Sequence, residues 1–504
     1  MIDVLICSVP AGIINRPPAA PALLKACAVQ AGFSARTVDF SLLLYQSYCN
    51  LDFEYYSQIN RQFEPYVEWL DHDVVQAWLD HCMQIIRNYN PKFLAISVFS
   101  TYQHRATVLL SSCVRQQFPH IKIIVGGYGL PEPIRTTLLN FKELSGIDLI
   151  SNFDQYVQRH KLADYVVLGE GESQLVDILN GHSMSQTPVD LDTIPPGNFD
   201  DYKLNHYLWH NEPVLTITGS KGCVRSCTFC NVPTKFGRYR RKTGNLLAQE
   251  IIHLSQTYGI HKFEFTDSLV NGSLKDFEQL ITTLAQYNQN TSKPITWYGQ
   301  YICRPQAQVP NRLYQLMKHS GAVNLTIGAE SGSNEVLKAM NKKMAVEDIF
   351  NELDQFEKHG LQAQLLVMGS FYNETWDRFL ETLKFIANCH RYLAAGVISR
   401  IAVGLPLMIE PGEYLHINAD QLGIVVDPTN YSNWTVKDDP SNTWTERLQR
   451  KIIAQALLHS MNVSTNGNGI MELQHMIDQF KQYEKQLIAS DTNVDPRLFE
   501  TRSH

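Results

Sequence analysis

Three cysteines within eight residues form the stretch of this chain most suited to chemistry. Cys223, Cys227 and Cys230 lie in "GSKGCVRSCTFCNVP", flanked by glycine and polar residues. Thiolates are soft ligands that select iron–sulfur clusters or zinc over hard cations. A structural zinc site takes four protein ligands, so zinc would need one more from a distant residue. Three thiolates on a four-iron cluster leave one iron open to a small molecule, which is what a catalytic cluster requires.

The neighbours of these cysteines bear on the same site. Phe229 directly precedes the third cysteine, and we expect it to shield a cluster from water. The basic run "KFGRYRRKTG" (235–244) includes two aromatic residues and could bind nucleic acid. The net charge of -7 argues against that. We therefore expect the run to bind an anionic small molecule, and we expect no nucleic-acid partner.

Composition indicates an ordinary globular protein of several domains. A chain of 504 residues is too long for one core, and 44% hydrophobic with 18% charged residues is typical of soluble proteins. No apolar stretch approaches the ~20 residues that span a bilayer, and the N-terminus lacks the basic run of a secretory signal. The other seven cysteines are scattered singly, as in a reducing compartment. We expect a cytoplasmic protein with no membrane partner.

Strands and helices alternate over the first 180 residues. The predicted strands are 3–9, 34–40, 93–100, 121–129 and 163–173, and residues 41–90 are predicted as inserted helices. Continuous apolar runs suit parallel strands buried on both faces. The pattern predicts an α/β, Rossmann-like, doubly wound parallel sheet, whose ligand crevice lies at the carboxyl ends of the strands. There the loops read "VPAGIINRPPAAP", "SVFSTYQHR", "GGYGLPEP" and "GEGES".

A second alternating series follows a proline-containing linker at 181–212. Its strands are predicted near 213–219, 262–267, 295–301, 323–329, 362–369 and 398–404, with helices between most of them. Six βα units predict a partial (β/α)6 barrel over 213–435, and active groups of barrels lie on the loops after the strands. The three cysteines follow the first strand of this series. Residues 436–504 are predicted as a helical region, with helices at 444–460 and 470–489.

Cys-x3-Cys-x-aromatic-Cys after the first strand of such a barrel resembles the radical S-adenosylmethionine (SAM) enzymes. The resemblance covers residues 210–430. It implies a 4Fe–4S cluster held by the three cysteines, with SAM bound to the open iron through its amine and carboxylate. One electron then cleaves SAM to methionine and a 5′-deoxyadenosyl radical that abstracts hydrogen from an unactivated carbon.

Further stretches carry this resemblance. "FTDSLVNGS" (265–273) looks like the second-strand segment, which implies that Asp267 contacts the methionyl amine. "GAESGSNEVLKAMNK" (328–342) looks like the fourth-strand segment along the ribose. "MGSFYNET" (368–375) resembles the turn after strand five without its usual proline, and "PLMIEPGEYLHINADQLGI" (406–424) resembles the sixth-strand region. The predicted SAM-binding residues are Phe229, Asp267, Gln300, Arg304, Glu330 and Ser331, of which Gln300 and Arg304 could instead contact substrate.

Residues 1–180 resemble the cobalamin-binding domain that precedes the barrel in one subclass of these enzymes. The implied cobalamin-binding residues are Pro10, Ser100, Thr101, Gly126, Gly127, Gly169, Glu170 and Gly171. Glycines let a backbone approach a cofactor closely, although those at 126–129 could simply form a tight turn. The chain lacks the Asp-x-His-x-x-Gly pattern that supplies a lower ligand to cobalt. His104 is the nearest candidate, and we expect it in a loop or at the surface, so cobalamin would bind without a protein ligand or not at all.

Three hypotheses remain. The first is a cobalamin-dependent radical SAM enzyme, a methyltransferase acting on an unactivated carbon or phosphorus centre, with rearrangement or cyclisation as a variant. The second keeps the cluster chemistry, but the N-terminal domain binds substrate or partner instead of cobalamin. The third is a zinc- or cluster-stabilised binding module that does not cleave SAM. Either enzyme would need an electron donor such as flavodoxin or ferredoxin, and its substrate, a small molecule or peptide, is not readable from the sequence.

Overall fold

A computed structural model describes residues 1–61, 63, 72–131, 152–207, 212–305, 308–427 and 431–461. The chain divides into two compact units. The first is Met1–Ser220 with Arg240–Thr266, and the second is Lys221–Tyr239 with Asp267–His504. This division places the beginning of the second βα series in the first unit, whereas the sequence suggested a boundary within 181–212. The cysteines and the later strands of that series belong to the second unit.

The first unit is built on a five-stranded parallel sheet with the order β2-β1-β3-β4-β5. Its strands are β1 (Ile2–Ser8), β2 (Ala35–Asp39), β3 (Pro91–Ser97), β4 (Lys122–Gly126) and β5 (Tyr165–Val167). The strand order reverses between β1 and β3, where open α/β sheets bind ligands. The predicted doubly wound sheet is confirmed. β4 ends at Gly126, earlier than predicted, because Gly127 has a φ of +124°, a backbone conformation that cannot continue a strand.

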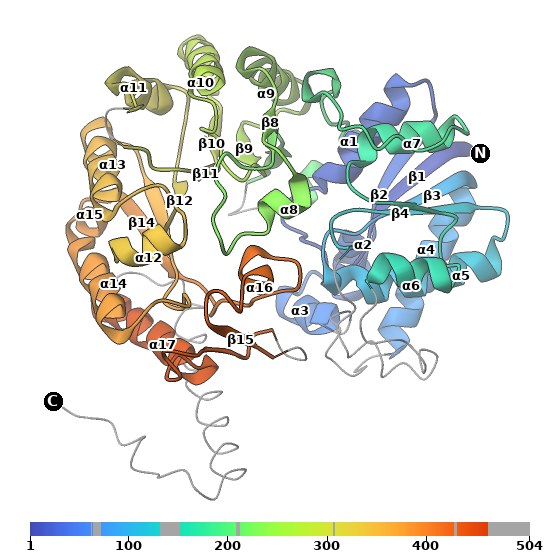
Figure 1. Cartoon of the computed structure of the whole chain (residues 1–504). Helices are drawn as coiled ribbons and strands as arrows, with labels where there is room; N and C mark the ends of the chain where they lie inside the picture. The colour runs from blue at the N-terminus through green and yellow to red at the C-terminus, as the bar shows by residue number, and fades with distance from the viewer. Residues whose placement is uncertain are drawn as a thin grey trace, which may run out of the picture. The chain divides into compact units, whose positions relative to one another are not determined.

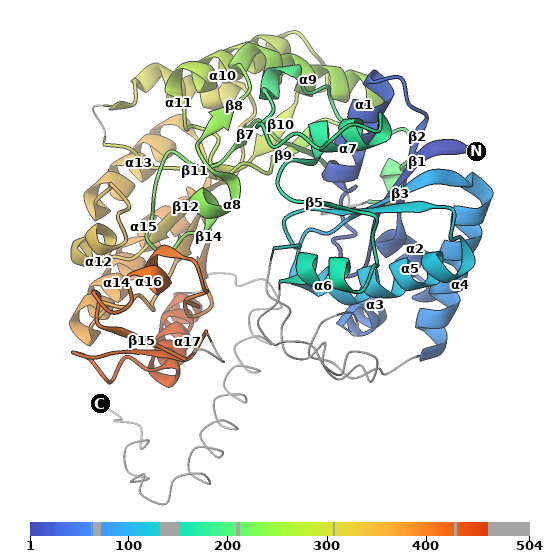
Figure 2. The same ribbon diagram turned by 45° about the vertical axis from the view of Figure 1, so that its right-hand side comes forward.

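Helices cover both faces of this sheet (Figures 1 and 2). Helices α1 (Ala19–Gln30) and α7 (Gly171–Leu179) lie on one face and share a core with it, while α4 (His72–Tyr89) and α5 (His104–Gln117) lie on the other. Further elements of the unit include α2 (Phe40–Tyr48), α3 (Phe53–Arg61), α6 (Phe153–Arg159), β6 (Leu215–Ile217), β8 (Arg240–Arg241), α9 (Gly244–Tyr258) and β9 (Lys262–Phe265). Helices α2 to α4 are the predicted insert, as far as the described residues extend.

The second unit contains a parallel sheet with the order β11-β12-β13-β14. The strands of this sheet are β11 (Gln300–Tyr301), β12 (Leu325–Glu330), β13 (Ala363–Val367) and β14 (Ile398–Val403). The unit also contains β10 (Thr296–Tyr298), which lies outside this sheet. Its helices are α8 (Val232–Phe236), α10 (Leu274–Gln289), α11 (Asn311–His319), α12 (Asn334–Ala339), α13 (Val346–His359), α14 (Trp376–Asn388), α15 (His390–Ala394) and α16 (Tyr414–Ile417). Each predicted strand of the second series overlaps an observed one, and helices follow them in the predicted order.

The C-terminal part differs from the prediction in one element. Strands β15 (Ile424–Val426) and β16 (Trp434–Val436) pair antiparallel, a hairpin that the sequence did not predict because each strand has only three residues. Helix α17 (Trp444–Ser460) has the predicted bounds, and the side chain of Thr443 caps it by accepting from the Glu446 N–H. The predicted helix at 470–489 lies outside the described residues. None of the described helices is long and apolar enough to cross a membrane.

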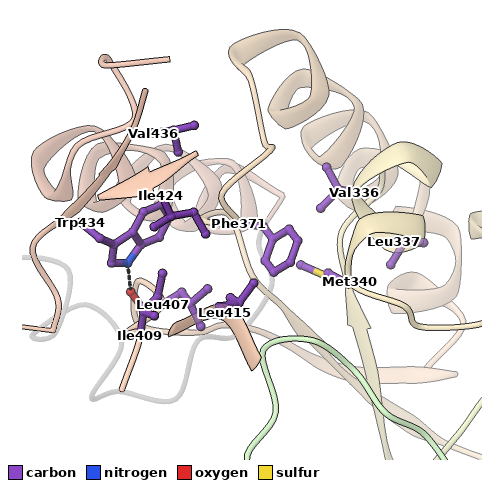
Figure 3. Packing of buried hydrophobic residues seen from close by; sticks show 10 residues of the cluster. All are labelled: Val336, Leu337, Met340, Phe371, Leu407, Ile409, Leu415, Ile424, Trp434 and Val436. Carbon is purple, nitrogen blue, oxygen red and sulfur yellow. Dashed lines mark hydrogen bonds between the residues drawn. The ribbon is translucent and has the colours of Figure 1, made fainter. Parts of the chain in front are cut away.

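A hydrophobic cluster joins the hairpin to the loops after β12, β13 and β14 (Figure 3). Phe371 lies between Met340 and the group around Trp434, whose indole N–H donates to the Leu407 carbonyl at 2.8 Å. The buried members of this cluster are Val336, Leu337, Met340, Phe371, Leu407, Ile409, Leu415, Ile424, Trp434 and Val436. The cluster therefore supports the loops that follow the strands, where the active groups of barrels lie.

Candidate functional site

The three cysteines lie on one loop, residues 222–231, here called the cysteine loop. Gly222 opens it with a φ of +81°, and a Cβ there would come within 3.0 Å of the Gly237 carbonyl oxygen, so only glycine fits. All three thiols are half-buried and free. The Cys230 N–H donates to the Cys227 carbonyl at 3.1 Å, and α8 begins just after Cys230. The loop is therefore held as a tight turn between two fixed ends.

Burial controls the acidity of two of these thiols. It raises the pKa of Cys227 to about 11 and also raises the pKa of Cys230. The positive charge of Lys342 works in the opposite direction on both groups. Metal ligation requires thiolates, so metal binding at this loop would release protons.

The segment 339–342, which begins at the last residue of α12, clamps the cysteine loop from the side. The N–H and hydroxyl of Thr228 donate to the carbonyls of Met340 and Ala339, both at 3.1 Å. The amide of Asn341 donates to the carbonyl and hydroxyl oxygens of Ser226 at 2.9 and 3.1 Å. These bonds hold the residues on either side of Cys227.

An ion pair lies beside this clamp. The Nζ atom of Lys342 is 3.1 Å from Oε1 of Glu330, the last residue of β12, and 5.9 Å from the ring centre of Phe229. Phe229 packs against the hydrophobic cluster and meets Phe371 edge-on at 6.3 Å. The structure thus brings together the cysteines, Phe229 and Glu330.

The other predicted SAM-binding residues are placed differently. Asp267 is buried directly after β9, and Gln300 is exposed on β11. Arg304 donates to the carbonyls of Asn271 and Gly272 at 2.9 and 3.0 Å, so it already braces the loop after β9. Their contact with SAM stays a prediction.

Ser331 is fully buried and faces α14. Its hydroxyl lies 3.1 Å from the Thr382 hydroxyl and 3.5 Å from a carboxylate oxygen of Glu374. It also accepts the Ser333 N–H at 3.1 Å. These bonds make Ser331 a support of the loop after β12, and a direct contact with SAM is likewise untested.

Within the described residues, no three His, Cys, Asp or Glu side chains converge closely enough to hold a single metal ion. In an iron–sulfur cluster each cysteine ligates a different iron, so the thiols spread around the cluster instead of meeting at one point. The soft donor set, the half-buried loop and the aromatic side chain beside it fit a cluster with three protein ligands.

The predicted cobalamin residues lie at the carboxyl edge of the five-stranded sheet. A Cβ on Gly127 would come within 2.2 Å of the Val98 carbonyl oxygen, and one on Gly129 within 2.7 Å of the Ser100 nitrogen. These glycines are therefore required by the turn itself. Gly169 differs, because it has a φ of +87° and a Cβ there would meet nothing within 4 Å. Open space above a glycine is where a ligand can approach the backbone.

Apolar side chains are exposed along this same edge. Ile13, Phe99, Tyr102 and Leu168 follow β1, β3 and β5 and are 40–72% exposed. Pro10 and Thr101 are buried beneath these loops, Ser100 is half-buried, and Gly126 packs against Val167. An apolar surface at the carboxyl edge of an α/β sheet fits the apolar face of a large, flat ligand such as a corrin.

Glu170 and Gly171, at this edge, already have structural roles within the protein. The carboxylate of Glu170 pairs with Arg240 and accepts the Val189 N–H at 3.0 Å, and Gly171 begins α7. His104 was expected in a loop or at the surface, and that expectation is wrong. It is 1% exposed, begins α5, stacks on Phe153 at 3.8 Å, and lies 2.7 Å from the Gly129 carbonyl through Nε2.

Residues 217–386 match the sequence model of the radical SAM superfamily. This match identifies a radical SAM domain within that segment. The matched segment contains the cysteine loop, Glu330 and the 339–342 clamp.

Solved structures of radical SAM proteins share the fold over most of the chain. The radical SAM methyltransferase TsrM from Kitasatospora setae, solved with cobalamin and a [4Fe-4S] cluster, has a TM-score of 0.57 at 15% identity, over 85% of this chain and 81% of that one. The cobalamin-dependent SAM radical enzyme OxsB, solved with aqua-cobalamin and SAM, has a TM-score of 0.64 at 13% identity, over 96% and 71%. The predicted α/β class, with a Rossmann-like unit before a radical SAM barrel, is confirmed.

A curated relative is more similar in sequence but covered less completely. An uncharacterised methyltransferase of Pyrococcus horikoshii is 22% identical over 310 residues, which are 60% of this chain and 65% of the relative. The match thus spans just under two thirds of that protein.

Sequence reasoning missed the clamp on the cysteine loop. Thr228, Asn341 and Lys342 stand in stretches quoted for other reasons, and nothing in the sequence distinguishes Lys342 from the adjacent, exposed Lys343. Pairing between the cysteine loop and a segment more than 100 residues away is a tertiary contact that local patterns do not carry. The expectation that the basic run 235–244 binds an anionic small molecule does not extend to all of its residues. Arg240 and Lys242 pair with Glu170 and Glu250 inside the protein.

Proposed function

We propose that this radical SAM protein is a cobalamin-dependent enzyme of the methyltransferase class. It would cleave SAM reductively and methylate an unactivated carbon or phosphorus centre. The observation that carries the proposal is the clamped loop of Cys223, Cys227 and Cys230. Three cysteine ligands on a four-iron cluster would leave one iron open to SAM. When bound, the cluster and SAM supply one-electron chemistry and cobalamin carries the methyl group.

The residues of the second unit would bind and orient SAM. The three cysteines hold the cluster, and Phe229 shields it from water. Glu330 offers a carboxylate that suits ribose hydroxyls, and Asp267 offers one that suits the methionyl ammonium. Orientation of this kind lowers the barrier by fixing the reacting groups before the chemical step.

The first unit would hold cobalamin at the carboxyl edge of its sheet. The exposed apolar residues Ile13, Phe99 and Leu168 suit the face of a corrin, and Gly169 leaves room for close approach. His104 is buried and engaged, so cobalt would have no protein ligand from this side chain. Rearrangement or cyclisation of substrate is the variant that the same site allows.

Two further parts of the proposal concern partners and location. The substrate would be a small molecule or a peptide, and the electron would come from flavodoxin or ferredoxin. The ten cysteines, all among the described residues, form no disulfide, which is consistent with the cytoplasm.

Anaerobic reconstitution of the purified full chain tests the proposal. We expect about four iron and four sulfide per chain for one cubane, cobalt in equal amount to protein, and 5′-deoxyadenosine with methionine after reduction in the presence of SAM. Cys227→Ala should lose the cluster and SAM cleavage. Cys113→Ala, a half-buried thiol on α5, should keep both.

The outcomes separate the competing functions. Iron, sulfide and 5′-deoxyadenosine without cobalt would favour a radical SAM enzyme whose first unit binds substrate or partner. A bound metal without any SAM cleavage would favour a binding module. Full SAM cleavage by Cys227→Ala would overturn the catalytic cluster altogether.

A further inference from the structure

The ion pair between Glu330 and Lys342 occupies space that is free because residue 328 has no side chain. A Cβ on Gly328 would lie 2.4 Å from Oε1 of Glu330 and 3.1 Å from Nζ of Lys342, so the pair rests directly over that glycine. Both side chains are largely buried, at 13% and 14% exposure. A residue larger than glycine at 328 would displace the pair.

The backbone of Glu330 has an unusual conformation at the point where the side chain forms this pair. Its φ is +64°, a left-handed conformation that non-glycine residues rarely adopt, and the pairing of β12 with β13 shifts register between Gly328 and Glu330. Such conformations are costly and persist where the surroundings enforce them, commonly at functional sites. The bend turns the carboxylate toward Lys342.

Lys342 also faces the cysteine loop. Its ammonium lies 5.9 Å from the centre of the Phe229 ring, and the three residues before it bond to Ser226 and Thr228 on either side of Cys227. The adjacent Lys343 is exposed. Of these two neighbouring lysines, Lys342 thus faces the cysteine loop, whereas Lys343 faces solvent, where its charge is strongly screened.

We propose that Lys342 is a positioning residue with two effects: it holds the Glu330 carboxylate in place for SAM, and its positive charge makes the cluster easier to reduce. The proposal rests on the function proposed above. Reduction adds one electron to the cluster, and a nearby buried cation stabilises the added negative charge. The bond to Glu330 fixes the ammonium at that place, so the two effects depend on one contact.

Three variants of the full-length, reconstituted protein test this inference, with the cluster midpoint potential and SAM affinity as measurements. Lys342→Met should shift the potential to a more negative value. It should also weaken SAM binding about tenfold, the loss expected for a charge-assisted hydrogen bond. Lys343→Met removes the same charge one residue away and should match the wild type in both. Lys342→Arg keeps the positive charge and should therefore retain most of the wild-type potential.

Glu330→Gln gives a second test with the opposite sign. It removes the negative partner of Lys342, so the potential should become less negative while SAM binding weakens. Adding Lys342→Met to Glu330→Gln should weaken SAM binding little further, because the two residues act through one contact. A purely structural role would shift both potentials in the same direction. If Lys342→Met fails to fold or to take up iron, Glu330→Gln and Lys342→Arg still decide the question.

The inference is overturned if Lys342→Met and Lys343→Met give equal potentials and equal SAM affinities. It is also overturned if Glu330→Gln shifts the potential to a more negative value. The proposed function fails separately, and visibly, if the wild-type protein neither assembles a cluster nor binds SAM.

Discussion

Asn341 is the residue on which the clamp of the cysteine loop most depends. Its side chain makes two hydrogen bonds to Ser226, at 2.9 and 3.1 Å, and its φ is +56°. Asn341→Ala should lower stability by about 2 kcal/mol, since it loses both bonds and strains the left-handed backbone. We expect lower iron occupancy after anaerobic reconstitution, measured against protein.

Asn341→Gly separates the two causes. Glycine relieves the backbone strain but still lacks the amide, so its iron occupancy should fall as in Asn341→Ala while its Tm falls less. Wild-type iron occupancy in both variants would show that the clamp does not hold the loop.

Glu352 gives the second unit a pH-dependent stability. It is 2% exposed, and the hydroxyls of Tyr301 and Tyr314 donate to its two oxygens at 2.7 and 3.2 Å. Burial raises the pKa of Glu352 to about 7 from its usual 4.5. The folded state therefore binds more protons than the unfolded state between these values. The stability from this group is fully present below pH 4.5 and is lost as pH rises through 7.

Glu352→Gln should remove that dependence. From pH 5 to pH 8 the variant should gain stability relative to wild type by up to about 3 kcal/mol, the equivalent of the shift in pKa. Urea unfolding at several pH values measures the difference. A difference that stays constant across this range would contradict the raised pKa.

Among the elements, the hairpin β15–β16 does most to support the site from a distance. Trp434 is fully buried within the hydrophobic cluster (Figure 3). The centre of its ring lies 3.6 Å from the Arg447 guanidinium carbon, and Phe229 packs against the same cluster. Trp434→Ala should cost about 3–5 kcal/mol through the cavity it leaves. Iron occupancy should fall with it, because the support behind Phe229 loosens.

Trp376→Ala is the matched control on α14. This tryptophan is 44% exposed, so its loss should change stability by less than about 1 kcal/mol and leave iron occupancy unchanged. Equal losses in urea unfolding for the two variants would mean that the hairpin is not a core element.

The elements also show what the sequence could predict. Long apolar runs such as β1 and the well-capped helix α17 were predicted almost to the residue, because period and caps are local signals. The hairpin was not, because its buried Trp434 is defined by partners from three other segments. The same reason explains the site. The cysteines were found by their spacing, whereas Lys342 and Asn341 act through contacts that only the folded chain creates.

At the scale of the whole molecule, the two proposed cofactor sites draw on different units. The cysteine loop and its clamp belong to the second unit, and the carboxyl edge of the five-stranded sheet belongs to the first. Each unit has its own core, with Val4, Ile6 and Ala95 in the first and Phe371 and Trp434 in the second. The two cofactors should therefore load independently.

Two variants test this independence. Gly169→Ala places a methyl group in the open space at the carboxyl edge and strains a φ of +87°, so cobalamin affinity should fall while iron content stays at the wild-type value. Gly181→Ala has the same kind of backbone, φ +72° with nothing within 4 Å, but lies beyond α7. It should cost the same ~1 kcal/mol of strain and leave cobalamin affinity unchanged.

Conversely, Cys227→Ala should lose iron and keep cobalamin. Equal cobalamin affinity in the two glycine variants would remove Gly169 from the cobalamin site, and loss of cobalamin with Cys227→Ala would show that the sites are coupled.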